Sequence, residues 1–400
     1  MIKFDFKTYT KKFINQDNWN NYISKKNEYI NQLKQCDMIG WMRKIDDEVV
    51  EEIKSTSTWI KNNFDTLIVI GIGGSFLGSF SFDKALRRYF NDEKFEIIYA
   101  GTTLSSKYLE ELLDYLKDKN YIINVISKSG TTMETTITYK ILKDDLKRRF
   151  GEKSKEHIIV TTDEEKGTLR EEVNKEGYKS FNVPNDIGGR YSFMTPAHLL
   201  PLSLNYDIER IMDGYNRGKK LIDYAFEYAL TRFLLYKNNK LVENYCVYEE
   251  NLSYFTEWLK QLFGETEGKE GKGIFPTSTI HTRDLHSLGQ FIQEGNKILF
   301  ETFIKIEEEE NYIDFNNRNL HEINNIVEDS VIYAHYIGNV PCMEITMNQL
   351  NEETLPELMY FFQLSAAFSA LLMGVNPFNQ PGVEVYKEEV RKALSNKETI

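Results

Sequence analysis

Short apolar runs and longer amphipathic stretches alternate along most of the chain. In the first half, strand-like runs rich in β-branched residues occur at Leu67–Ile70, Phe95–Tyr99, Tyr121–Ile126 and His157–Thr161. The pattern restarts after about residue 201, with runs at Asn244–Tyr248, Ile298–Ile306 and Val340–Met347. Apolar strands separated by helices are typical of parallel sheets built from right-handed βαβ units. We therefore predict an α/β protein with two doubly wound parallel sheets, each sandwiched between helical layers.

The restart of the pattern divides the chain into residues 1–200, an N-terminal arm plus the first half, and residues 201–400, the second half. The most apolar helical stretch, Leu358–Val375, contains Gln363 and two serines, so we interpret it as a buried core helix rather than a membrane span. A C-terminal helix is predicted over Val383–Leu394, where hydrophobic and charged residues again alternate at helical spacing.

The composition of the chain limits the kinds of molecule that it is expected to bind. The chain has 49 basic and 61 acidic residues and a net charge of −12, which argues against broad binding of nucleic acid or anionic membranes. Three scattered cysteines, without the local spacing of a metal site, favour a reducing compartment. The N-terminus lacks the apolar core of a signal peptide, so we expect a cytoplasmic protein.

A hydroxyl-rich loop follows the predicted strand Tyr121–Ile126 and precedes a predicted helix, Met133–Phe150. Its residues are Ser127, Lys128, Ser129, Gly130, Thr131 and Thr132. A helix N-terminus offers free backbone N–H groups and the positive end of the helix dipole to an anion, and hydroxyls add further donors. The loop therefore predicts a phosphate-binding site.

A second loop, Gly71–Gly78, follows the strand Leu67–Ile70 directly. Its glycines resemble a dinucleotide fingerprint, but the third glycine position holds Phe76 and no acidic residue ends the next strand. A P-loop is also excluded, because Gly78 is followed by Ser79 and Phe80 rather than by lysine and a hydroxyl residue. The loop predicts a close backbone approach to some other ligand, or only a tight turn.

Acid–base candidates come later in the chain. Glu265 and Glu267 flank a threonine where a predicted helix enters a glycine-rich loop, and the local pattern does not tell them apart. His286, Arg190 and Lys387 each stand in a distinctive segment, although alone each is more often structural or solvated. We assign no role to the other histidines.

Together these segments resemble the bacterial-type glucose-6-phosphate isomerases. The resemblance runs from about Gly40 to the C-terminus and includes two long signatures, Gly-Gly-Arg-Tyr-Ser and Asn-Pro-Phe-x-Gln-Pro-Gly-Val-Glu. Six blocks carry it in family order: Gly71–Gly78, Ser127–Thr135, Gly188–Pro201, Gln261–Lys269, Asp284–Gly295 and Asn376–Lys387. The resemblance implies that each half is a sugar isomerase domain and that the chain interconverts glucose 6-phosphate and fructose 6-phosphate through a cis-enediolate.

By this resemblance the loop Ser127–Thr132 holds the substrate phosphate. Gly74 and Ser75 match the family's sugar-contacting pair, and Gln261 matches its substrate-binding glutamine.

The catalytic residues are carried over in the same way. Glu265 matches the base that moves a proton between C2 and C1, whereas Glu267 does not, so we expect replacement of Glu267 to be mild. His286 and Lys387 match the pair that opens the sugar ring, and Arg190 matches the arginine beside the developing oxyanion.

The resemblance also implies the assembly and location. A hexose phosphate is the expected small-molecule partner of a cytoplasmic homodimer, in which His286 reaches the site of the neighbouring subunit. No cofactor, metal, nucleic acid or membrane is expected. Three positions depart from the common family pattern: Thr266 replaces serine, His198 replaces glycine and Asn379 replaces aspartate.

Two other functions stay open at this point. A sensor that binds a sugar phosphate without converting it would keep the hydroxyl-rich loop but would not need Glu265, His286, Arg190 and Lys387 together. An isomerase of another aldose phosphate would differ only in the recognition of one hydroxyl at C2, which the sequence does not resolve.

Overall fold

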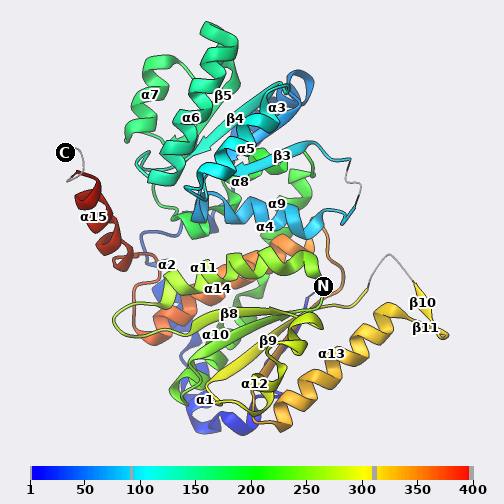
Figure 1. The fold of residues 1–400 in the computed structure, drawn as a ribbon. Coiled ribbons are helices and arrows are strands. Elements are labelled where there is room, and N and C mark those ends of the chain that lie inside the picture. The colour runs from blue at the N-terminus through cyan, green and yellow to red at the C-terminus, as the bar shows by residue number, and fades with distance from the viewer. Residues whose placement is uncertain (1, 91–92, 309–312, 396–400) are drawn as a thin grey trace.

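The computed structural model describes residues 2–90, 93–308 and 313–395, which form two αβα halves stacked on one another (Figure 1). The first half surrounds an all-parallel sheet whose strands are β2 (Thr66–Ile70), β3 (Glu96–Ala100), β4 (Tyr121–Ile126), β5 (Ile158–Asp163) and β6 (Lys179–Val183). The second sheet contains β7 (Val242–Val247), β8 (Phe275–Ile280), β9 (Leu299–Ile306), β12 (Cys342–Met347) and the antiparallel β1 (Lys3–Asp5). A small hairpin pairs β10 (Asp314–Phe315) with β11 (Arg318–Asn319).

The two sheets share one strand order. The first runs β3-β2-β4-β5-β6, and the second, read from its other edge, runs β8-β7-β9-β12-β1. In both, the first parallel strand lies between the second and the third, so the winding direction reverses beside it. Ligands of doubly wound sheets bind at the carboxyl ends of the strands at this reversal. The predicted fold class is confirmed.

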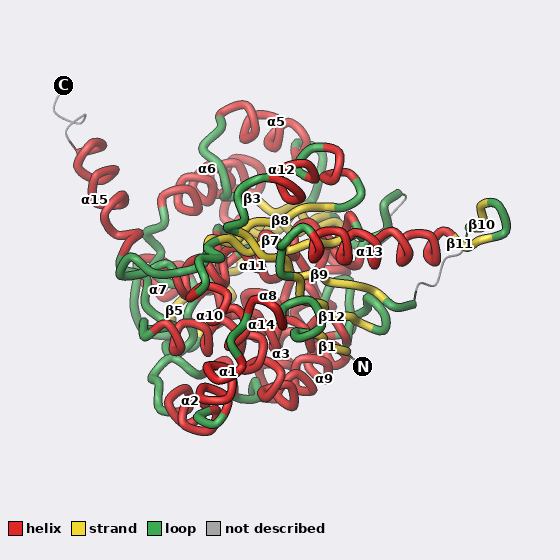
Figure 2. Tube along the Cα trace, turned by 90° about the horizontal axis from the view of Figure 1, so that it is seen from below, coloured by secondary structure: helices red, strands yellow, loops and turns green. Residues whose placement is uncertain are grey.

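Helices cover both faces of each sheet (Figures 1 and 2). Those of the first half are α3 (Asp47–Asn63), α4 (Leu77–Leu86), α5 (Ser106–Leu116), α6 (Met133–Phe150), α7 (Thr168–Glu176) and α8 (Pro196–Leu202). Those of the second half are α9 (Ile208–Gly218), α10 (Ile222–Lys237), α11 (Ser253–Glu267), α12 (Gly289–Glu294), α13 (Leu320–Ile337) and α14 (Thr354–Met373). The arm contributes α1 (Gln16–Ile23) and α2 (Lys26–Lys34), and α15 (Gly382–Ser395) ends the described chain.

Alternate residues of the central strands face opposite helical layers. In β2, Leu67 and Val69 join a large core that extends between the two halves, whereas Ile68 and Ile70 join the core beneath α5, α6 and α7. In β7, Cys246 likewise faces away from the shared core, toward α12 and α13. Because this core contains residues of both halves, hydrophobic burial holds the two halves in a fixed relative position.

The predicted core helix is confirmed. Among the described residues, α14 is the helix that is long and apolar enough to fit a membrane span, but 94% of its apolar window is buried inside the protein. It packs against α9, α10 and α11, and its apolar residues are therefore explained by the core.

The N-terminal arm, which the sequence analysis assigns to the first half, packs instead on the second. Strand β1 pairs with β12, with Phe4 opposite Ile345, and the Phe4 ring stacks on Phe361 of α14 with 4.7 Å between centroids. Among the described residues, the second half has four parallel strands of its own, so β1 supplies the fifth and covers the open edge of β12.

Candidate active site

The C-terminal turn of α11 brings the second half to the carboxyl edge of the first sheet. Glu265 lies in this last turn of the helix rather than in the loop that follows. One helical turn earlier, Gln261 Nε2 donates to Glu265 Oε1 at 3.1 Å. The carboxylate side chain keeps 29% of its surface exposed, so it is held in place and still open to a ligand.

Arg190 reaches Glu265 from the first half. It lies in the 3₁₀ helix η5 (Gly189–Met194), and its side chain is 2% exposed. Its Nη1 lies 3.4 Å from Glu265 Oε2, and its Nε donates to Thr266 Oγ1 at 2.8 Å. The threonine hydroxyl that replaces the usual serine is therefore used, as an acceptor for the guanidinium.

The same guanidinium fixes the segment that leads to α15. Nη2 donates to Pro377 O at 2.6 Å and to Asn379 O at 3.3 Å, and Nη1 donates to Gln380 Oε1 at 3.0 Å. Asn379 is contacted through its backbone, so the aspartate-to-asparagine departure leaves this bond unchanged. Gln380 is a site residue that the sequence analysis did not single out, although it lies within a matched block.

Glycines bring two loops into backbone contact beside Gln261. Gly73, in the 3₁₀ helix η3 (Gly73–Ser75), has φ +56°, and a Cβ there would lie 2.9 Å from Gln261 Nε2. A Cβ on Gly74 would lie 2.2 Å from the carbonyl carbon of Gly189. Any side chain at Gly74 would push the Gly74–Ser75 turn away from the segment that carries Arg190.

His198, the departure in the Gly188–Pro201 block, fastens this contact. Its Nδ1 accepts from the backbone N–H of Ser79 at 3.0 Å, which places the ring proton on Nε2, 2.8 Å from Gly74 O. The Nε2 atom also lies 3.1 Å from Ser192 Oγ. Burial lowers the pKa of His198 to about 4, so the ring is neutral at physiological pH. The imidazole therefore positions the Gly74–Ser75 turn.

The hydroxyl-rich loop lies next to this turn, because β2 and β4 are paired neighbours. Thr132 is the N-cap of α6 but makes no side-chain capping bond, and Ser129 and Thr131 are exposed. In the first turn of α6, Thr135 Oγ1 is buried without a hydrogen-bond partner among the described residues. Backbone N–H groups and hydroxyls are thus open to an anion here, and Thr135 joins the candidates.

Two members of the loop shape it rather than face outward. Gly130 has φ +69°, and a Cβ there would lie 2.4 Å from Thr168 Oγ1. The ammonium of Lys128 donates to three backbone carbonyls of the segment before the Gly188 motif, at 2.9–3.4 Å. Burial lowers the pKa of Lys128 from its ordinary value. Lys128 therefore joins the hydroxyl-rich loop to the segment that leads to Arg190.

Glu267 belongs to the core. Its side chain is fully buried and forms an ion pair with Arg232 of α10, which also pairs with Glu243 at 2.7 Å. Ile274 N donates to Glu267 Oε2 at 3.3 Å. Replacement of Glu267 would remove its bonds to Arg232 and to Ile274 N, so we expect it to cost stability, whereas a mild effect on activity stays a prediction.

Lys269 is a further candidate that the sequence analysis left inside a motif. Its ammonium donates to Asn376 O. Burial and then the nearby charge of Arg190 lower its pKa to about 8, partly offset by Glu265. The two charges that act on it place Lys269 beside the Glu265–Arg190 pair, where its own charge changes near pH 8.

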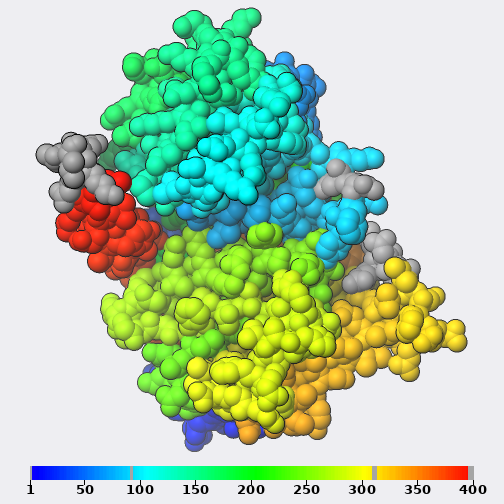
Figure 3. Space-filling view, viewed as in Figure 1, coloured from blue at the N-terminus to red at the C-terminus, as the bar shows by residue number. Residues whose placement is uncertain are grey.

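His286 and Lys387 lie away from this group. His286 ends the 3₁₀ helix η8 (Arg283–His286) and is exposed. Lys387 lies on α15 and pairs with Glu384 at 2.8 Å. In the part of the chain that the structure describes, no hydrogen bond or ion pair joins either residue to Glu265. Figure 3 shows α15 as a separate lobe beside the junction of the two halves.

The sequence matches one family over most of its length. The profile of the phosphoglucose isomerases matches residues 36–326. Glucose-6-phosphate isomerases of Staphylococcus aureus (strain Newman) and Staphylococcus haemolyticus (strain JCSC1435) are 42% identical over 381 residues, which cover 88% of this chain and 86% of each relative. The chain belongs to the phosphoglucose isomerase family.

Solved structures agree with this fold. A hypothetical protein from Thermus thermophilus superposes with a TM-score of 0.85 at 24% identity, over 98% of this chain and all of the other. A glucose-6-phosphate isomerase from Chlamydia trachomatis gives a TM-score of 0.81 at 20% identity, over 94% of this chain and 85% of that one. The chain thus shares its paired αβα architecture with these two structures.

Proposed function

We propose that Glu265 is the base with which this phosphoglucose isomerase interconverts glucose 6-phosphate and fructose 6-phosphate. The observation that carries the proposal is the position of its carboxylate, held by Gln261 and Arg190 yet part exposed. A carboxylate placed over the open-chain sugar removes the acidic C2 proton and returns it to C1, which turns the aldose into the ketose. Glu267, fully buried in its ion pair, is closed to a substrate.

The substrate phosphate binds at the start of α6. The uncapped helix N-terminus and the hydroxyls of Ser129, Thr131, Thr132 and Thr135 supply donors without a large positive patch. Because the phosphate is remote from C1 and C2, its binding energy serves to orient the reacting carbons beneath Glu265.

Arg190 stabilises the enediolate intermediate. Its guanidinium is permanently charged and is fixed by hydrogen bonds from both halves of the chain. A donor held in place before the reaction needs no reorganisation when negative charge develops on the sugar oxygens, and such a group is worth on the order of 10²–10³ in rate.

Ring opening is assigned to His286 and Lys387, which transfer a proton from O1 to the ring oxygen. We infer that His286 acts in the site of a second copy of the chain. Its exposure supports this, as does the apolar surface that follows it, where Leu288 and Phe291 are 46% and 49% exposed. For Lys387 to reach the substrate, α15 must fold toward the junction of the two halves. The segment before α15 is the fixed end of this movement, because Arg190 binds Pro377 and Gln380 there.

A cytoplasmic location completes the proposal. Cys36, Cys246 and Cys342 are all free thiols, which fits a reducing compartment, and the substrates are phosphorylated metabolites.

The test compares Glu265→Gln with Glu257→Gln, an exposed position on the same helix that pairs with Lys260. Turnover of fructose 6-phosphate is measured with a chelator present, and binding of fructose 6-phosphate is measured by calorimetry. We expect Glu265→Gln to lose at least about 10²-fold in kcat while binding the sugar phosphate, and the control to match the unmodified protein. Residual turnover of Glu265→Gln above about 1% would exclude Glu265 as the base.

A further inference from the structure

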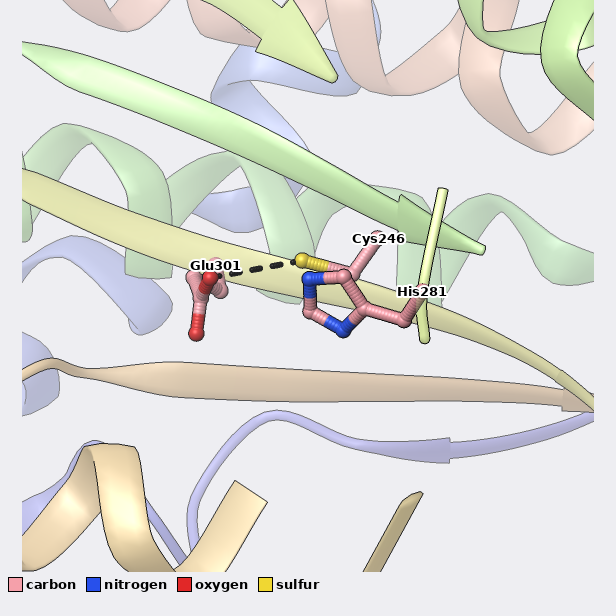
Figure 4. Close-up of side chains that lie close together, drawn as sticks. All are labelled: Cys246, His281 and Glu301. Atoms are coloured by element: carbon pink, nitrogen blue, oxygen red, sulfur yellow. Dashed lines mark hydrogen bonds between the residues drawn. The ribbon is translucent and has the colours of Figure 1, made fainter. Parts of the chain in front are cut away.

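A second cluster of reactive side chains lies buried on the face of the second sheet that α12 and α13 cover, away from the proposed active site. It consists of Cys246 on β7, His281 directly after β8 and Glu301 on β9 (Figure 4). One ligand atom of each lies within 4.8 Å of the other two, and none of the three residues is more than 3% exposed. No step of the proposed reaction uses any of them.

The register of the sheet brings these residues together. Strand β7 lies between β8 and β9, Cys246 pairs with Thr279, and Asn244 pairs with Glu301. Side chains two residues apart point to the same face, so Thr279 and His281 join Asn244, Cys246 and Glu301 there. This face otherwise packs apolar residues beneath α12 and α13, on the side opposite α11.

Hydrogen bonds satisfy only part of the cluster. Glu301 Oε1 accepts from Cys246 Sγ at 3.4 Å and from Asn244 Nδ2 at 3.0 Å, and Glu301 Oε2 lies 2.6 Å from His335 Nδ1. In contrast, Asn244 Oδ1 and His281 Nδ1 are buried with no hydrogen-bond partner among the described residues. Buried polar atoms in native proteins are normally paired, so these two call for an explanation.

The Asn244 amide is aimed into the cluster. Its nitrogen lies 3.2 Å from Cys246 Sγ, 3.0 Å from Glu301 Oε1 and 2.9 Å from Thr279 Oγ1, which is one acceptor more than its two hydrogens can serve. Half a turn of the amide exchanges the nitrogen with the unpartnered oxygen. Cys246, Glu301 and the oxygen of Asn244 then form three corners separated by 3.0–3.4 Å. Ligands around tetrahedral Zn²⁺ stand about 3.3–3.7 Å apart, given bond lengths of about 2.0–2.3 Å.

We propose that Cys246, His281 and Glu301 bind one divalent transition-metal ion of the Zn²⁺ type, with the Asn244 amide oxygen as the fourth ligand. A thiolate, an imidazole and a carboxylate are the ligand types that Zn²⁺ takes in proteins. Binding releases the thiol proton of Cys246 to solvent, and the two anionic ligands then balance the charge of the ion. His335 on the far oxygen of Glu301 orients the carboxylate.

The ion has a structural role. It joins three adjacent strands, and one ligand, His281, begins the segment that ends in His286. The site does not depend on the proposed isomerase mechanism. Because its ligands come from three separate strands, spacing along the sequence does not reveal it.

The test uses the full chain, freed of metal with a chelator and then titrated with Zn²⁺ or Co²⁺ alone. We expect one ion per chain and, for Co²⁺, the charge-transfer absorption of a cobalt–thiolate bond. Cys246→Ser is expected to abolish this absorption and to weaken Zn²⁺ binding by about 100-fold or more. Cys36→Ser, at a cysteine outside the cluster, is the matched control and is expected to keep both.

His281→Gln gives a second variant, which should also lose stoichiometric binding, and isomerase turnover reports whether each variant folds. The absence of Zn²⁺ and Co²⁺ uptake by the unmodified chain would overturn the proposal and leave a hydrogen-bonded network. Retention of the cobalt–thiolate absorption in Cys246→Ser, or its loss in Cys36→Ser, would overturn it as well.

Discussion

Arg190 lies in the first half of the chain and binds the residues of the second half that surround the proposed base. One guanidinium contacts the carboxylate of Glu265, the hydroxyl of Thr266 and the backbone that leads to α15. A lysine at this position could not make all of these bonds, because it lacks the planar, forked donor set. In the proposed mechanism, Arg190 therefore orients the base as well as stabilising the intermediate.

The two glutamates of the α11 terminus have opposite roles, and their variants should differ accordingly. Glu267→Gln removes one of the two carboxylates that bind the buried Arg232, which stays paired with Glu243, so we expect it to lower the free energy of unfolding by about 1–3 kcal/mol. Urea denaturation measures the effect, with the exposed Glu257→Gln expected to stay within about 0.5 kcal/mol of the unmodified protein. A loss below about 1 kcal/mol for Glu267→Gln would contradict the structural role.

The lowered pKa of Lys269 predicts that substrate affinity depends on pH. Because its pKa is lowered to about 8, the ammonium is charged below that pH and neutral above it. A positive charge beside Glu265 favours an anionic sugar phosphate, so KM for fructose 6-phosphate should rise as the pH passes through 8. Lys269→Arg keeps its charge and should remove the rise, whereas Lys269→Met should show a high KM throughout. An unchanged pH profile in Lys269→Met would show that another group titrates.

At the scale of elements, the strands and helices that the apolar pattern marks are found, and those it misses have a physical reason. Helix α6 has the predicted bounds, and the central strands β2, β4 and β9 lie where apolar runs occur. Strands β6 and β8 lie at sheet edges, where polar residues and Pro276 are tolerated, so their sequences lack a continuous apolar run.

The candidate site residues divide in the same way: local patterns mark some of them, and others depend on contacts that only the fold creates. Motifs locate the loop Ser127–Thr132, Arg190 and Glu265, because each follows a strand or ends a helix in a recognisable segment. Sequence spacing alone does not separate Glu265 from Glu267, since the difference depends on Arg232, which approaches from another helix. Long-range partners such as His198 with Gly74 are equally invisible before the fold is known.

Helix α15 is the element whose position bears most on turnover. Its side chains are largely exposed, including Val385 at 68% and Tyr386 at 60%, so it adds little to the core. Lys387→Ala should therefore leave the free energy of unfolding unchanged but lower kcat for the closed sugar by about 10²-fold. Lys392→Ala, at an outward position on the same helix, is the control. Equal turnover in the two variants would remove Lys387 from the mechanism.

At the scale of the molecule, the two halves repeat one strand order but contribute different parts of the proposed site. In the proposed mechanism, the first supplies the phosphate site at the carboxyl ends of β2 and β4, and the second supplies the base from α11. Their shared core fixes the distance between the two, while His286 is left on the surface. We therefore propose that a second copy completes each site.

Mixing two inactive variants tests that requirement. Glu265→Gln and His286→Ala chains that exchange subunits form hybrid dimers in which one of two sites has both residues intact. About a quarter of the sites in an equal mixture should then recover, measured as turnover of glucose 6-phosphate. No recovery in a mixture shown to exchange subunits would mean that each site is built from one chain.

The most direct measurement of the central claim follows the C2 proton itself. In D₂O, the unmodified protein should exchange the C2 proton of glucose 6-phosphate for deuterium, seen as loss of that signal by proton NMR, because the base passes its proton to solvent during some turnovers. Glu265→Gln, which still binds the sugar phosphate, should show no exchange above the rate without protein. Exchange by Glu265→Gln at the unmodified rate would show that another residue is the base.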